Sequence, residues 1–157
     1  MNPTGGTNIA MTQSGSILVY YDGSPEAKCA LERTGKLASS CGKRVHVLVV
    51  IDTVSAIASS AGMLSGAAYS VMVGATSVIL DEAVLHLTAQ GTVPRGHASQ
   101  GGVVDAITRH AALVDADMIV VGYRRLRGLA KWLSSHPTLD QLVERSAGRT
   151  VVAVPVA

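Results

Sequence analysis

The chain has 157 residues, of which 48% are hydrophobic and 15% are charged. This length and composition fit one globular domain with a hydrophobic core, and they exclude a disordered chain. A formal net charge of +2 gives no general case for nucleic-acid binding. With no Phe and only one Trp, the core must be built from Val, Leu, Ile and Ala.

The cysteine usage and the hydropathy pattern indicate a cytoplasmic protein. Cys29 and Cys41 fall in one predicted helix, without the number or spacing of a disulfide scaffold or a metal site. We see no signal-peptide pattern at the N-terminus. The stretch from Thr53 to Leu80 carries no charge, but it is rich in Ser, Gly, Ala and Thr, so we expect no membrane span.

Strand and helix patterns alternate along the chain. Residues 1–15 are polar and rich in Gly, Thr and Ser, which predicts a disordered tail before a single domain over residues 16–157. Hydrophobic periodicity then predicts strand Ile17–Tyr21, helix Pro25–Cys41, strand Arg44–Ile51, helix Val71–Gln90, strand Thr92–Ala98, helix Gly102–Val114, strand Met118–Val121, helix Thr138–Ala147 and strand Thr150–Val156. This alternation predicts an α/β fold with a parallel sheet and helices on both faces.

Local signals support several of these boundaries. Ser24 suits the N-cap of the first helix, which then begins at Pro25. Pro94 and Gly96 interrupt the third strand, which places it near a sheet edge. Residues 52–70 read as a long loop, and a loop of that length is typical of a lid or a binding loop.

The fourth strand, the loop after it and the start of the next helix form the candidate ligand-binding segment. Gly122 is predicted to end this strand, and a basic loop with Arg124, Arg125 and Arg127 comes next. The helix begins near Pro137 and Thr138, where Thr138 and Gln141 form a capping box unless Pro137 is itself the first helical residue. Free N–H groups converge where a strand, a loop and a helix N-terminus follow one another, so this segment could bind phosphates.

The order and spacing of several segments resemble the universal stress protein family. These segments are ILVYYDGSPEAKCAL, VHVLVVID, ADMIVVG and LDQLVERSAGRTVVAVPV, and the resemblance covers nearly the whole chain from Ser16 to Val156. It implies a five-stranded parallel sheet in the order 3-2-1-4-5, of the Rossmann-like, adenine nucleotide alpha hydrolase-like type. It also implies a homodimer through the last strand, at Val151, Val152, Ala153 and Val154.

Family members that bind ATP carry G-x2-G-x9-G-[S/T] after the fourth strand. The glycines let bare backbone N–H groups wrap the phosphates, and the hydroxyl adds a donor. Here only Gly122 is kept, because the other positions hold Arg125, Ser135 and His136. Arginines could neutralise phosphates directly, but a side chain at position 125 obstructs close approach of the backbone. We therefore expect ATP binding to be lost or weakened.

The rest of the nucleotide pocket that the resemblance implies is better preserved. Asp22 stands where an acidic residue contacts the ribose, and Val50 where backbone groups meet the adenine. Each has an alternative role, and for Asp22 the residues alone favour the two roles about equally. Asp22 could instead hold the turn before the first helix, and Val50 would be apolar in any buried strand. The implied site is thus Asp22, Val50, Gly122, Arg124, Arg125, Ser135 and His136.

Enzymatic function has little support in the sequence. The five histidines share no metal-ligand spacing, and no G-x-S-x-G nucleophile elbow is present. We therefore predict no catalytic residue and no metal. The first hypothesis is a dimeric, non-enzymatic regulatory module acting on a protein partner. The second is a switch that binds ATP or AMP as its cofactor and hydrolyses ATP slowly.

Overall fold

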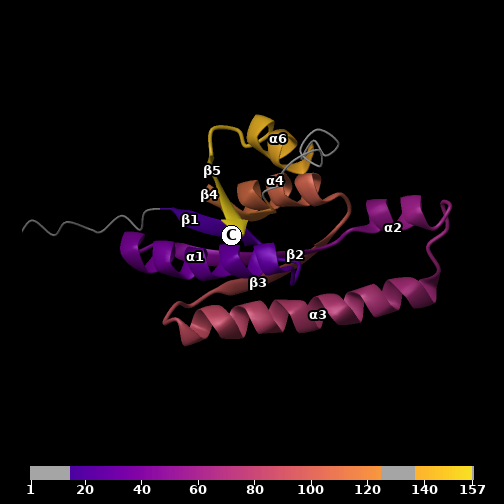
Figure 1. Cartoon of the computed structure of the whole chain (residues 1–157), viewed down its shortest axis with the longest axis horizontal. Helices are drawn as coiled ribbons and strands as arrows, with labels where there is room; N and C mark the ends of the chain where they lie inside the picture. The colour runs from indigo at the N-terminus through magenta and orange to yellow at the C-terminus, as the bar shows by residue number, and fades with distance from the viewer. Residues whose placement is uncertain (1–14, 125–136, 157) are drawn as a thin grey trace, which may run out of the picture.

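The computed structural model describes residues 15–124 and 137–156, and the predicted disordered tail therefore lies, except for Gly15, outside the described residues. Strands and helices alternate as expected (Figure 1). Their bounds are β1 Ser16–Tyr20, α1 Pro25–Cys41, β2 Arg44–Ile51, α2 Thr53–Ser59, α3 Gly66–Ala89, β3 Arg95–Gln100, α4 Val103–Leu113, β4 Ala116–Arg124, α6 Pro137–Glu144 and β5 Thr150–Val156.

The sheet confirms the expected fold class. Its five strands are all parallel and follow the order β3-β2-β1-β4-β5. β1 lies at the centre, where Val19 pairs with Val47 of β2 and with Val120 of β4. β3 and β5 form the two edges, so the third strand does lie at an edge, although it covers Arg95–Gln100, after Pro94, and not Thr92–Ala98.

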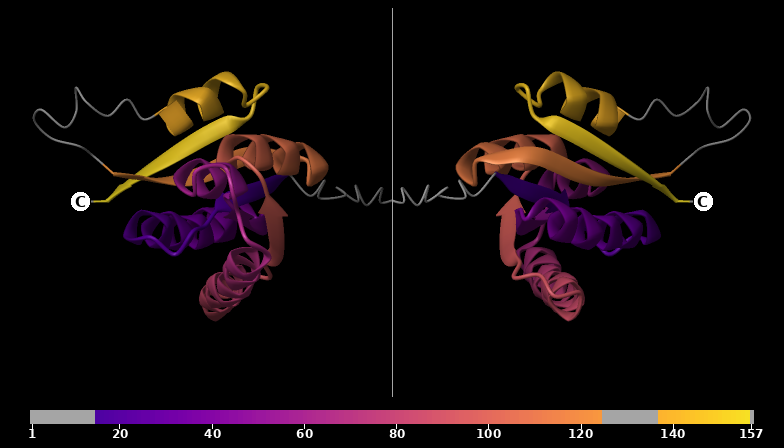
Figure 2. Two further views of the ribbon diagram at one scale, coloured as in Figure 1. Left: turned by 90° about the vertical axis from the view of Figure 1, so that its right-hand side faces the viewer. Right: turned by 90° about the vertical axis from the view of Figure 1, so that its left-hand side faces the viewer.

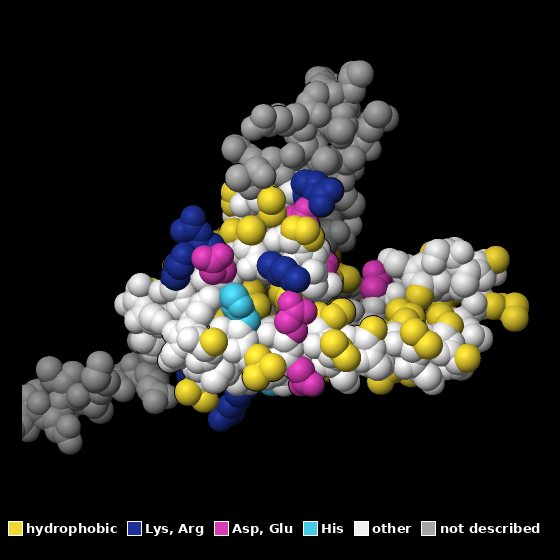
Figure 3. Space-filling model, turned by 60° about the horizontal axis from the view of Figure 1, so that its bottom comes forward, with side chains coloured by type: hydrophobic (Ala, Val, Ile, Leu, Met, Phe, Trp, Pro, Cys, Tyr) yellow, Lys and Arg dark blue, Asp and Glu magenta, His cyan; other side chains and the backbone are white. Residues whose placement is uncertain are grey.

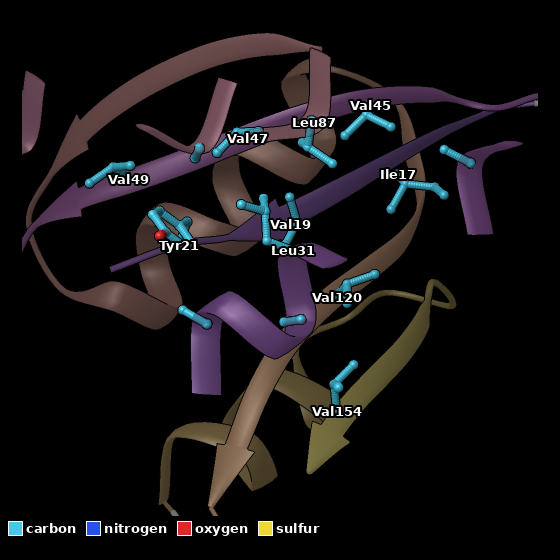
Figure 4. Packing of buried hydrophobic residues seen from close by; sticks show 14 residues of the cluster. Ile17, Val19, Tyr21, Leu31, Val45, Val47, Val49, Leu87, Val120 and Val154 are labelled. Atoms are coloured by element: carbon cyan, nitrogen blue, oxygen red, sulfur yellow. The ribbon is translucent and has the colours of Figure 1, made fainter. Parts of the chain in front are cut away.

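Helices cover both faces of the sheet, in three layers (Figure 2). On one face α1 and α3 pack on a cluster that includes Val19, Leu31 and Leu87 (Figure 4). On the other face α4 and α6 pack on a second cluster that includes Leu18, Ile107 and Leu142. Because the central strands are apolar on both sides, each face of the sheet can bury its own core.

The predicted ends of α1 agree with the structure, whereas α6 ends at Glu144 and not at Ala147. The hydroxyl of Ser24 accepts a hydrogen bond from the N–H of Ala27 at 3.1 Å, and Pro25 is the first helical residue. Gly42 ends the helix in the left-handed conformation, with φ of 63°. α6 begins at Pro137, which supports Pro137 as its first helical residue and not a cap at Thr138.

The predicted long loop over residues 52–70 is wrong. α2 occupies its first part, and α3 begins at Gly66 rather than at Val71. Asp52 and Ser65 cap these helices, since each side chain accepts a hydrogen bond from the N–H three residues on. The segment lacks large apolar residues, and we read that as a loop. A side-chain cap at each start and several Ala residues of high helix propensity favour helices here despite the lack of large apolar side chains.

The end of β4 and the burial of α3 also need comment. β4 does not end at Gly122 but continues to Arg124, which makes this arginine a strand residue rather than a loop residue. Within α3, Val73 is 38% exposed because this part of the helix extends past the sheet, whereas Leu87 is fully buried.

By length and composition, α3 is the one helix among the described residues that could span a membrane. Much of its C-terminal half packs on the sheet, where Gly96 of β3 lies against Leu80 and Val84. Its N-terminal half and α2 project beyond the sheet as an arm (Figure 1). We call α2 and residues 66–78 of α3 the helical arm.

Candidate functional site

The carboxyl ends of β1, β2 and β4 meet at one edge of the sheet. β1 lies between β2 and β4, so the chain leaves the sheet in opposite directions on either side of this point. Open α/β sheets bind ligands at such a switch point. Asp22 follows β1 and Arg124 ends β4, so the structure brings these two predicted site residues to this edge, together with Asp52, which follows β2.

Asp22 holds the turn that leads into α1. Its Oδ1 accepts a hydrogen bond from the N–H of Ser24 at 3.0 Å, and its side chain is exposed. Holding this turn is the structural role that the sequence offered as the alternative to ribose binding. The other oxygen, Oδ2, has no hydrogen-bond partner among the described residues.

Gly122 is required by packing against α1. A Cβ atom at this position would lie 2.3 Å from the carbonyl carbon and oxygen of Glu26 and 2.7 Å from the N of Ala27. Backbone atoms cannot move aside as a flexible side chain can. The first glycine of the phosphate motif is therefore needed for the approach of a helix to a strand, whether or not a phosphate binds.

Arg124 is paired within the chain. Its Nε donates to Oε1 of Glu26 in the first turn of α1, in an ion pair in which the Glu26 side chain is 13% exposed and that of Arg124 is 65% exposed. The pKa of the Glu26 carboxyl lies below its ordinary value, chiefly because its own backbone N–H donates to it, and then because of Arg124. The arginine that we expected to meet a phosphate thus already has a carboxylate partner.

A mostly apolar cavity lies beside these residues. Its volume is about 200 Å³, below the roughly 300–1,000 Å³ of typical ligand pockets. It is lined by Tyr20, Ile107, Val121, Gly122, Tyr123, Arg124, Leu139 and Leu142. The cavity could accept a flat or aliphatic group more readily than a polyanion.

Of the remaining predicted site residues, the structure describes only Val50. Val50 is buried in β2, and its side chain belongs to the core cluster on the α4 face. That placement accounts for its apolar character without a ligand. Arg125, Ser135 and His136 lie outside the described residues.

Sequence reasoning missed Tyr20 and Glu26 at this edge. Burial, with the carboxylates of Asp22 and Asp52 nearby, raises the pKa of the Tyr20 hydroxyl above its ordinary value. Its neighbour Tyr21, on the opposite side of β1, donates to Glu82 of α3 at 3.2 Å. A carboxylate in the first turn of α1 was visible in the sequence, but its pairing with a residue 98 positions later was not.

Three of the five histidines gather away from this edge, between β2, β3 and α4. His46 Nδ1 lies 2.8 Å from His97 Nε2, and the ring of His97 meets that of His110 with centroids 4.6 Å apart. Burial and the positive charges nearby lower the pKa of all three. Among the described residues no group of His, Cys, Asp and Glu could hold a metal ion.

Comparison with known proteins gives the context for this site. A model of the universal stress protein family matches residues 14–155. A solved structure of that family from Burkholderia pseudomallei is 24% identical, with a TM-score of 0.66 over 92% of this chain and 98% of that one. No curated protein matches the chain.

Two other solved structures contain a nucleotide. A universal stress protein in complex with cAMP is 22% identical, with a TM-score of 0.65 over 89% of this chain and 96% of that one. The universal stress protein from Archaeoglobus fulgidus in complex with dAMP is 18% identical, with a TM-score of 0.64 over 90% and 98%. At these identities the likeness establishes the fold alone.

Proposed function

The chain belongs to the universal stress protein family, and from that premise we propose that it is a small, cytoplasmic regulatory module of the stress response. In this proposal it has no enzymatic activity, acts through a protein partner, and binds ATP weakly or not at all.

The pairing of Arg124 with Glu26 carries this proposal. A triphosphate at this edge would have to compete with the Glu26 carboxylate for the guanidinium, and that carboxylate would itself repel the phosphates. The cavity beside the pair is small and mostly apolar. The absence of glycine at positions 125 and 135 is also expected to weaken the binding of a triphosphate.

A nucleotide-dependent switch is the second candidate function. Relatives of the same fold were solved with cAMP and with dAMP, and these ligands carry one phosphate instead of three. Asp22 would offer its Oδ2 to the ribose, and the cavity lined by Tyr20 and Leu139 would receive part of the ligand. This candidate leaves room for slow ATP hydrolysis as a secondary activity.

Calorimetry and chromatography separate the two candidates. Purified protein is denatured and the released nucleotide is quantified, and the protein is then titrated with ATP, AMP and cAMP. We expect no stoichiometric nucleotide and little heat from ATP. Stoichiometric ATP released from the wild-type chain would refute the first candidate.

Two sets of variants test the reason for weak binding. Glu26→Gln frees Arg124 and should raise ATP affinity, whereas the control Glu32→Gln breaks an exposed pair with Lys36 and should not. The triple change Arg125→Gly, Ser135→Gly and His136→Ser restores the phosphate motif. If neither Glu26→Gln nor the triple change raises ATP affinity, then neither the ion pair of Arg124 nor the missing glycines account for weak ATP binding.

We also propose that the protein forms a homodimer through β5. This strand is a sheet edge, and Val151, Val152 and Ala153 are at least partly exposed there. Light scattering of Val152→Lys should show a reduced mass, with thermal unfolding to verify the fold. Val143→Lys on α6, where the valine is 54% exposed, is the control. A β5 variant that keeps its mass while folded would place any dimer contact elsewhere.

A further inference from the structure

α3 is apolar on two opposite sides, and the sheet covers only one of them. The covered side includes Thr76, Ala83 and Leu87, which are buried. A helix that is apolar all round is normally buried all round. We therefore expect the exposed apolar side of α3 to contact another molecule.

The uncovered side of α3 carries a regular seam. Its members follow one another at steps of four and three residues in alternation, and all of them are exposed: Ala67, Val71, Gly74, Val78, Asp81 and Leu85. We call these residues the outer seam. Its large members are strongly exposed, at 72% for Val71 and 69% for both Val78 and Leu85.

This spacing is that of the a and d positions of a coiled coil, which face a partner helix. At 100° per residue, the seam lies on the side of α3 opposite Thr76, Ala83 and Leu87. Hydrophobic side chains are spread along this surface of the molecule (Figure 3). Apolar surface that continues along an exposed helix marks an interaction site.

We propose that the outer seam pairs with the outer seam of a second copy, with the two α3 helices antiparallel. If the two-fold axis passes midway between Gly74 and Val78, each small residue meets a large one. Gly74 lies opposite Val78 of the second copy, Ala67 lies opposite Leu85, and Val71 lies opposite Asp81. A parallel pair would instead set glycine against glycine, which leaves a gap that nothing fills.

The charges of the helix disfavour a charged partner and the parallel orientation. No charged residue occurs from Thr53 to Leu80, so the helical arm offers no charge for a charged partner to complement. Asp81 is the one charge of the outer seam. The antiparallel pair separates the two Asp81 residues by ten positions, about 15 Å at 1.5 Å per residue, beyond the Debye length of about 10 Å at 0.1 M salt.

The size of the outer seam indicates how stable the complex can be. From Ala67 to Leu85 the helix extends for about 27 Å. A strip of this length and about 10 Å wide covers about 270 Å², which is well below the roughly 800 Å² per partner of a standard stable interface. The pair is therefore a reversible dimer whose population depends on protein concentration. It uses a surface separate from β5, and it does not depend on the proposed function.

Sedimentation equilibrium of the full chain tests the pairing. In a Val152→Lys background, which removes the proposed β5 contact, we expect mass to rise with concentration. Val78→Glu combined with Leu85→Glu should raise the dimer dissociation constant by about tenfold or more. Leu113→Glu is the matched control, since Leu113 is 72% exposed on α4 and off the seam. Masses that are equal in seam variant, control and parent would overturn the proposal.

Cysteine cross-linking tests the orientation. In a Cys29→Ser, Cys41→Ser background, the pair Ala67→Cys and Leu85→Cys should give a disulfide-linked dimer on oxidation. Leu85→Cys alone should not, because the two copies of position 85 lie about 27 Å apart along antiparallel helices. Cross-linking by Leu85→Cys alone to the same extent as by the double variant would mean parallel pairing and would overturn the orientation.

Vesicle flotation tests the alternative occupant. Neutral phosphatidylcholine vesicles are mixed with the wild-type chain and with the Val78→Glu, Leu85→Glu variant. We expect neither protein to float. Flotation of the wild type alone, with a mass in the Val152→Lys background that does not depend on concentration, would assign the seam to a lipid surface and overturn the proposal.

Discussion

Acidification should destabilise the fold through His46. This histidine is 6% exposed on β2, and its ring stacks on His97 with centroids 5.1 Å apart. Burial lowers the pKa of His46 from 6.5 to about 4, and the charges of His97, Arg95, Arg44 and His110 act in the same direction. At neutral pH the ring is therefore uncharged in the folded chain.

The sign and size of the effect follow from proton linkage. Between pH 6.5 and about 4 the unfolded chain binds a proton at His46 and the folded chain does not, so the free energy of unfolding falls as the pH falls. For these two pKa values, His46 alone removes about 2 kcal/mol between pH 7 and pH 5. Over a chain of this length, that lowers Tm by about 4–8 °C. The pKa values of His97 and His110 are also lowered, so both add to the loss.

Urea unfolding at pH 7, 6 and 5 measures the loss, and it stays above the range in which most carboxylates titrate. His46→Asn keeps a hydrogen-bonding group near the Nδ1 position but cannot titrate, so its stability should change less over this range. His86→Asn is the control, because His86 is exposed on α3 outside the cluster. If His46→Asn loses as much stability as the wild type, the loss does not come from this ring and the reasoning is wrong.

Two substitutions test how α1 is held. Gly122→Ala should destabilise the fold by about 1–3 kcal/mol or more, because the new methyl group meets the backbone of Glu26. Gly74→Ala, where no atom lies within 4 Å, should be neutral or stabilising, and equal effects in thermal unfolding would contradict the packing argument. Ser24→Ala should cost about 1 kcal/mol, since it removes the N-cap bond to Ala27. A smaller loss than for Ser40→Ala, whose hydroxyl bonds within its own helix, would show that the cap contributes little.

The part of the fold that could be predicted depends on short-range signals. β2 is apolar over nearly its whole length, and α1 has a cap, a proline and a terminal glycine in consecutive order, so both were placed almost to the residue. Alternation of strands and helices gave the parallel sheet. The order of the strands came from the resemblance to a family, because no pattern within a strand specifies its neighbours.

The rest depended on contacts between distant segments. Glu26 and Arg124 are 98 positions apart, and nothing in either segment indicates that they meet. The helical arm was missed for a different reason. The arm extends past the sheet and has no core to pack against, so it does not show the single inward apolar stripe of a core helix. Its outer seam follows a seven-residue repeat instead.

The structure also changes what a retained glycine means at this site. Gly122 matches the phosphate motif, but contact with the backbone of Glu26 would demand glycine there in a chain that never binds a nucleotide. A match at this position therefore carries no information about the ligand. Gly122→Ala would likewise be uninformative about binding, since any loss could come from the fold. The position that reports on the ligand is Glu26, because Glu26→Gln leaves the packing in place and changes only whether Arg124 is available to an anion.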